Sequence, residues 1–234
     1  MNHLHRFEKF MTHCGQNRHL HSNSLTTTWM PVLLAAALAG FTGCASTRPA
    51  KYYQLDTPNS AAFAPSTDSG VTLTIANLSS THLYQQDGIV YTAVDGPMGT
   101  YEHDRWTESP AEMMQQVLMR SLRASGHYRG VYTLRDNPTG DFVIHGRIRD
   151  FREVDLSKNS ILARVSFDLQ LLDRQSGNTV WTHQYSHDEP VSGKDLNAVV
   201  AAFDKNVQQG VGDATAGLEQ YFASHPMRAA LENK

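Results

Sequence analysis

The chain has 234 residues, 40% of them hydrophobic and 18% charged, which excludes a fibrous or disordered protein and allows one domain with a packed core. Three basic residues and one acidic residue precede Cys44, so the part that follows holds 17 Lys and Arg against 22 Asp and Glu, a net charge of −5. A surface of that sign argues against nucleic acid as a partner.

An apolar run without charge leads to a cysteine near the start of the chain. No Asp, Glu, Lys or Arg lies between Arg18 and Cys44, and residues 29–42 form an apolar run of 14 residues. Because a transmembrane helix needs about 20 residues, this run fits a signal peptide and is too short for a membrane span. We therefore expect residues 1–43 to be a removable signal peptide, with translation starting at Met1 or at Met11.

The signal ends in Phe41-Thr42-Gly43-Cys44, which resembles the bacterial lipoprotein motif. The resemblance implies acyl chains, palmitate among them, on Cys44. It also implies sorting to the outer membrane, because Ala45 rather than Asp follows the cysteine. The alternative is an ordinary secretory signal with an unrelated cysteine, but no other cysteine occurs after residue 43. Since Cys14 lies inside the signal, we expect no disulfide.

The rest of the chain divides into a segment, a domain and a tail. Residues 44–70 contain the apolar Tyr52-Tyr53 pair and then a Pro, Ser and Ala stretch, which predicts a lipidated N-terminal segment and linker. Alternating apolar residues predict strands over 71–78 and 89–94 and a short third strand reaching Trp106. The domain is expected over 71–223, and residues 224–234 are expected to be a flexible tail.

Two helices and a meander complete the predicted domain. Ser109, Pro110 and Glu112 form a capping box, so a helix is expected to run from there toward Gly126. Residues 141–187 predict three antiparallel strands with one face exposed to solvent. A long amphipathic helix is expected to follow over about 195–222, and Gly210 and Gly212 predict a bend in it. We predict an α+β fold, an antiparallel β-sheet with two helices packed on one face.

The usual signatures of catalysis and of metal binding are missing. The sequence holds no Gly-x-Ser-x-Gly elbow, no His-Glu-x-x-His and no phosphate loop. His183 and His187 are the nearest metal-like pair, but positions i and i+4 of a strand lie about 13 Å apart. Asp150, Glu153 and Asp155 cluster at a strand end without a nucleophile or His, as solvated charges commonly do. We expect neither an enzyme nor a bound metal or cofactor.

The order of motifs resembles the ABC-type transport auxiliary lipoprotein family, the paraquat-inducible protein C-like subunits of membrane-integrity transporters. The resemblance covers nearly all of the chain after Cys44 and lies in these motifs: Tyr52-Tyr53-x-Leu55, Leu83-Tyr84-x4-Ile89-Val90-Tyr91, Arg105-Trp106 before the capped helix, Val165-x-Phe167-Asp-Leu169-x-Leu171-x-Asp173, Ser176-Gly177 and Val180-Trp181. It implies a lipid-anchored, non-enzymatic component in the periplasm, on the outer membrane. Its implied partners are a mammalian-cell-entry (MCE) domain protein and an inner-membrane permease, in a system that moves lipids or apolar solutes.

Alternatives remain at this stage. A regulator of envelope assembly or of cell-wall enzymes would show the same anchor without chemistry, and a hydrolase with an unusual site is a third reading. The oligomeric state, homo-oligomer included, and the cargo are left open. For the partner contact we predict the surface around Tyr84, Arg105 and Trp106, because aromatic and Arg side chains dominate binding energy at interfaces. The alternative is that Trp106 belongs to the core and Arg105 extends outward from it.

Overall fold

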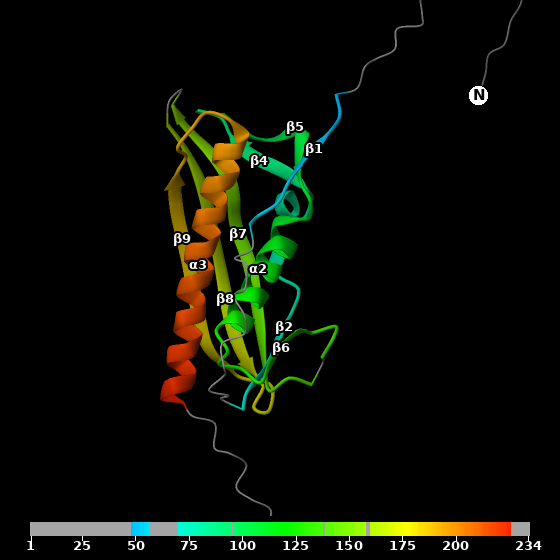
Figure 1. Cartoon of the computed structure of the whole chain (residues 1–234), viewed down its shortest axis with the longest axis vertical. Helices are drawn as coiled ribbons and strands as arrows, with labels where there is room; N and C mark the ends of the chain where they lie inside the picture. The colour runs from blue at the N-terminus through cyan, green and yellow to red at the C-terminus, as the bar shows by residue number, and fades with distance from the viewer. Residues whose placement is uncertain (1–47, 57–69, 95, 138, 158–159, 226–234) are drawn as a thin grey trace, which may run out of the picture. The chain divides into compact units, whose positions relative to one another are not determined.

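A curled sheet and two helices form the part of the chain that the structure, a computed structural model, describes (Figure 1). That part comprises residues 48–56, 70–94, 96–137, 139–157 and 160–225. The predicted signal peptide, Cys44, most of the predicted linker and residues 226–234 of the predicted tail lie outside the described residues.

Nine strands, one short 3-10 helix and two α-helices occur among the described residues. In chain order they are β1 (Lys51–Tyr53), β2 (Thr72–Ile75), β3 (Ser79–Ser80), η1 (His82–Tyr84), β4 (Gly88–Thr92), β5 (Met98–Trp106), α2 (Pro110–Ala124), β6 (Gly130–Thr133), β7 (Phe142–Ser157), β8 (Ser160–Asp173), β9 (Thr179–Pro190) and α3 (Leu196–Ser224).

Helix α2 begins where its capping box predicts. The Ser109 hydroxyl accepts from the Glu112 amide at 3.4 Å, and the Glu112 carboxylate accepts from the Ser109 amide at 3.0 Å, so each side chain satisfies an amide that lacks a helical partner. The helix ends at Ala124, before Gly126, which has a φ of 69°. One apolar stripe of the helix is buried: Met113, Met114, Val117, Leu118 and Leu122.

Helix α3 is continuous from Leu196 to Ser224 and passes without a break through Gly210 and Gly212, where a bend is predicted. Gly210 instead allows a close approach to the sheet. A Cβ atom there would lie 2.7 Å from the Tyr185 ring, whereas one at Gly212 would meet nothing within 4 Å. Close packing of α3 on the sheet therefore requires glycine at position 210, but not at position 212.

The predicted meander is confirmed. Strand β7 pairs with β8, and β8 with β9, both antiparallel and over most of their lengths. The alternation in β8 buries Val165, Phe167 and Leu169 on the inner face, next to α3. The intervening residues face outward, so the two-residue period of the sequence translates directly into one dry and one wet face.

The prediction of a purely antiparallel sheet is wrong, because the sheet is mixed. β1 is parallel to β5, β2 is parallel to both β6 and β7, and β4 is parallel to β7. The long strand β7 carries β8 on one edge and β2, β3 and β4 in turn on the other. The alternation of apolar and polar residues identifies a strand but does not give the direction of its neighbour. Parallel pairing of β2 and β6 needs a long connection, and the chain between them, which includes α2, provides it.

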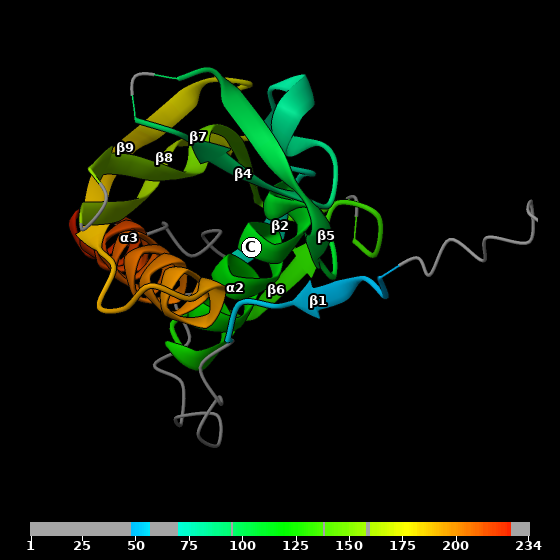
Figure 2. The ribbon, with the colours of Figure 1, turned by 90° about the horizontal axis from the view of Figure 1, so that it is seen from above.

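Both helices pack on the inner side of the curled sheet, side by side, as Figure 2 shows. The Ser121 hydroxyl of α2 lies 3.0 Å from the Thr215 hydroxyl of α3, and α3 also contacts β8 and β9. The α+β class and the two helices on one face are confirmed. One continuous core fills the curve between sheet and helices.

Candidate functional site

Trp106, predicted to contribute to a contact surface, lies in the core. It is 1% exposed at the end of β5, and its ring stands edge-on against Phe151 of β7 and Phe203 of α3, with centroids 5.7 and 5.6 Å apart. The Phe151 and Phe203 rings are themselves stacked at 4.6 Å. Trp106 therefore joins the sheet to α3, which is the alternative reading of its position in the sequence.

Tyr84 is also enclosed, at 3% exposure, in η1. Its hydroxyl donates to Asp150 Oδ1 at 2.8 Å, and burial raises the pKa of this phenol well above its ordinary value. Asp150 in turn lies 3.2 Å from Arg152. These contacts hold η1 against β7, so a partner protein can contact Tyr84 only if η1 moves away from β7.

Arg105 is the member of the predicted trio whose side chain reaches solvent, with 40% of it exposed. Its Nη1 donates to Asp87 Oδ1 at 2.9 Å, while the backbone carbonyl of Asp87 accepts from the Trp106 amide at 2.7 Å. The guanidinium is thus held at the surface directly above the buried indole. An exposed ion pair of this kind contributes about 0–1 kcal/mol to stability, so its removal should spare the fold.

Tyr52 lies beside Arg105, and the prediction from sequence missed it. In the parallel β1–β5 pair Tyr52 is the register partner of Arg105, so both side chains leave the same face, and Tyr52 is 62% exposed. Its neighbour Tyr53 is partly buried against the core and donates its hydroxyl to Asp104 at 3.1 Å. The signal was present in the sequence, because two adjacent tyrosines in a strand necessarily point to opposite faces. We call Tyr52, Asp87 and Arg105 the Tyr52 surface.

The predicted carboxylate cluster is divided between partners. Glu153 is 3% exposed and accepts from the Tyr101 hydroxyl at 2.9 Å, whereas Asp150 accepts from Tyr84. Burial raises the pKa of Glu153 above its ordinary value. These carboxylates therefore serve polar contacts within the fold.

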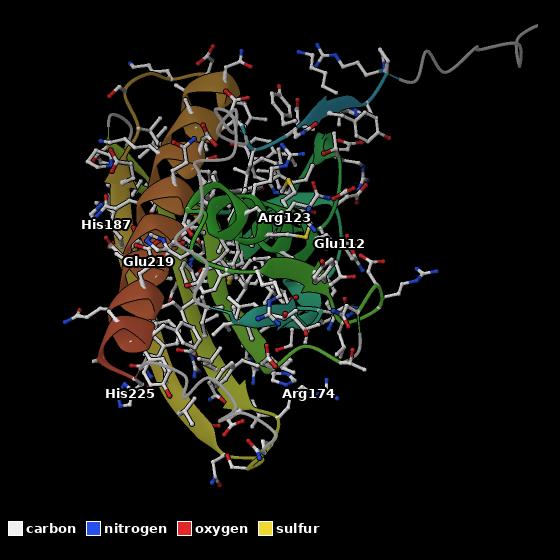
Figure 3. The ribbon with its side chains drawn as sticks, turned by 60° about the horizontal axis from the view of Figure 1, so that its bottom comes forward. Glu112, Arg123, Arg174, His187, Glu219 and His225 are labelled. Atoms are coloured by element: carbon white, nitrogen blue, oxygen red, sulfur yellow. The ribbon has the colours of Figure 1, made fainter. Side chains whose placement is uncertain are left out.

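The histidines are likewise spread out. His187 on β9 lies 3.4 Å from Glu189, and Figure 3 shows it well away from His225 at the end of α3. Across the described ranges no three His, Cys, Asp or Glu side chains gather as a metal site would require. Within the same ranges, no helix has the length and apolarity to cross a bilayer.

The architecture defines a class of α+β domain already seen in solved structures. Protein XCC0632 from Xanthomonas campestris is similar, with a TM-score of 0.62 and 18% identity, covering 75% of this chain and 98% of that one. A second solved structure, of an uncharacterized protein, has a TM-score of 0.57 and 13% identity, covering 73% and 99%. At these identities the likeness concerns the fold.

The match to a family model is more specific. Residues 53–213 match the model of the ABC-type transport auxiliary lipoprotein component, and the chain belongs to that family. No curated protein sequence matches the chain. The matched range begins at the last residue of β1 and ends inside α3, so it takes in strands β2 to β9. The resemblance inferred from the motifs is confirmed, and the chain is an auxiliary lipoprotein component of a transport system.

Proposed function

We propose that this protein is a non-catalytic subunit of an MCE/ABC-type system that moves lipids or other apolar solutes across the Gram-negative envelope. A lipid on Cys44 anchors it to the periplasmic face of the outer membrane, and its partners are an MCE-domain protein and an inner-membrane permease. The observation that carries the proposal is the family match, which starts at residue 53, nine residues after Cys44. A short segment between anchor and domain suits a protein that works at a membrane surface.

The anchor is tested by Cys44→Ala, with Cys14→Ala as its matched control. Several acyl chains, at about 0.8 kcal/mol per buried methylene, make release from the membrane negligible, and one substitution removes them all. We expect Cys44→Ala to leave the outer-membrane fraction while Cys14→Ala stays, and mass spectrometry of the mature N-terminus to find the acyl groups on Cys44. A Cys44→Ala protein that still sediments with the membrane contradicts the lipid anchor.

The partner contact is tested on the Tyr52 surface. Arg105→Ala removes a partly exposed guanidinium, and Arg174→Ala removes an exposed one from the turn between β8 and β9, the region labelled in Figure 3. We expect Arg105→Ala to weaken capture of an MCE-domain partner protein several-fold, and Arg174→Ala to leave it unchanged. Both variants should melt as the parent does. Unaltered capture by a folded Arg105→Ala protein places the contact elsewhere.

A further inference from the structure

One end of the outer sheet face is apolar, and the stretch of the same face next to it is charged. Register partners place a single row across five strands: Met98 of β5, Thr92 of β4, Val154 of β7, Leu162 of β8 and Pro190 of β9. Four of these five side chains are apolar. Beyond this row, Leu156 lies two residues after Val154, at a register shift near the end of β7, and Val94 lies in the turn that follows β4. We call Val94, Met98, Val154, Leu156, Leu162 and Pro190 the apolar rim.

Three members of the rim are open to solvent, while Val154 is 8% exposed. Leu156 is 55% exposed, Val94 47% and Met98 40%, three of the most exposed large hydrophobic side chains in the described ranges. Single exposed apolar residues need no explanation, but a contiguous set on one sheet end marks an interaction surface.

The adjoining row of the same face has the opposite character. Arg152 pairs in register with Arg164, and Arg164 with Asp188, which accepts two hydrogen bonds from its guanidinium at 2.7 Å each. Beyond it, Arg149 forms an ion pair with Asp168. The change from a charged field to an apolar edge takes place within one strand step. A sheet whose end meets an apolar phase requires such a boundary.

The path of the chain brings this end close to a membrane. β1 starts at Lys51, seven residues after Cys44, and pairs in parallel with Asp104–Trp106, at the other end of β5 from Met98. Because the pairing is parallel, the chain enters β1 from the direction of Met98. Seven residues reach at most about 25 Å when fully extended. Figure 1 shows β1, β4 and β5 together at one end of the ribbon. A lipid on Cys44 therefore confines this end of the domain to the neighbourhood of the bilayer.

We propose that the apolar rim rests in the surface of the lipid bilayer that holds the anchor, so that the domain is oriented by two contacts, the acyl chains and the rim. The inference rests on the lipid anchor of the proposed function. Two points of attachment fix a direction where one leaves a tethered domain free to rotate. The charged part of the outer face, with Arg149 and Arg164, is then held above the headgroups, facing the periplasm.

The cysteine content makes a direct test simple. Since the chain has only Cys14 and Cys44, the first in the predicted signal and the second acylated, a single introduced cysteine is the one free thiol of the mature protein. Leu156→Cys puts it on the rim. Gln175→Cys puts it in the exposed turn at the other end of β8, a strand of 14 residues and about 45 Å, as the matched control.

Each purified lipidated variant is labelled with an environment-sensitive fluorophore and reconstituted into vesicles of phosphatidylethanolamine and phosphatidylglycerol, with or without nitroxide-labelled lipid. We expect the fluorophore at position 156 to emit at shorter wavelength and to be quenched several-fold more by the nitroxide than the fluorophore at position 175. Equal quenching at both positions, in protein that floats with the vesicles, overturns the rim contact and leaves the anchor intact.

Two further outcomes are decisive. A shift at position 156 that is insensitive to nitroxide and grows with protein concentration means that a second copy covers the rim, and overturns the proposal. Protein that fails to float with the vesicles refutes the anchor itself and with it the inference.

Discussion

The same substitution at two positions of α3 is expected to change stability in opposite directions. Gly210→Ala places a Cβ atom 2.7 Å from the Tyr185 ring and 2.9 Å from the Phe167 ring, closer than real Cβ atoms come. Gly212→Ala, two residues along the same helix, meets nothing within 4 Å. Both exchange glycine for the best helix former, so the packing environment is the variable that separates them.

The magnitudes follow from the surroundings. Ala in place of Gly inside a helix stabilises by about 0.5–1 kcal/mol, and Gly212→Ala should receive that gain in full. At Gly210 the rings cannot retreat, because Phe167 is 1% exposed and the Tyr185 hydroxyl is held by Asn206 Oδ1 at 2.7 Å. Overpacking of this kind costs about 1–3 kcal/mol. Gly210→Ala should therefore be less stable than Gly212→Ala by about 1–3 kcal/mol.

The measurement is urea unfolding of the mature domain in a lipid-free Cys44→Ala background, followed by circular dichroism, with thermal melts as a second readout. A domain of this size changes its melting temperature by about 2–4 °C per kcal/mol. The melting temperatures of the two variants should therefore differ by several degrees, with Gly212→Ala above the parent and Gly210→Ala below it. If Gly210→Ala proves as stabilising as Gly212→Ala, the close approach of α3 to β9 is not what selects glycine there.

Two other expectations concern buried side chains. Because burial raises the pKa of Glu153, its ionised form opposes folding above that pKa, so Glu153→Gln should raise the free energy of unfolding at pH 7 and change it little below about pH 4, where the carboxyl is protonated in both states. A gain that is independent of pH in denaturant titrations would falsify this assignment. Trp106→Ala should lower the free energy of unfolding by about 3–5 kcal/mol through the cavity left between Phe151 and Phe203, and a loss below 1 kcal/mol would contradict its role in joining sheet to helix.

Local chemistry explains which elements the sequence predicts well. The meander appears in the alternation of apolar and polar residues, and α2 appears in a capping box that needs only Ser109, Pro110 and Glu112. These signals act between residues a few positions apart. For the same reason they are readable without knowledge of the remaining chain.

Pairing between distant segments explains what the sequence does not predict. Nothing local in Thr72–Ile75 specifies that its neighbours are Gly130–Thr133 and part of β7, or that both lie parallel to it. The contact residues show the same limit. Trp106 and Arg105 are adjacent in sequence, yet one is buried by α3, about 100 residues later, and the other is exposed. The sequence indicates that Tyr52 and Tyr53 face opposite ways, but which of the two is exposed depends on the pairing of β1 with β5, about 50 residues later.

The central place of β7 has a consequence for how the chain folds. β2, β3 and β4 each pair with β7. In the β2–β7 pair, for example, Leu73 is the register partner of Phe142, which lies about 70 residues later in the chain. A polypeptide synthesised from its N-terminus therefore presents these earlier strands before β7, which completes their pairing, is available. Long-range pairing of this kind slows folding and leaves unpaired strand edges exposed in the interim. We therefore expect the sheet to form late, once residues through the β7–β8 hairpin are available.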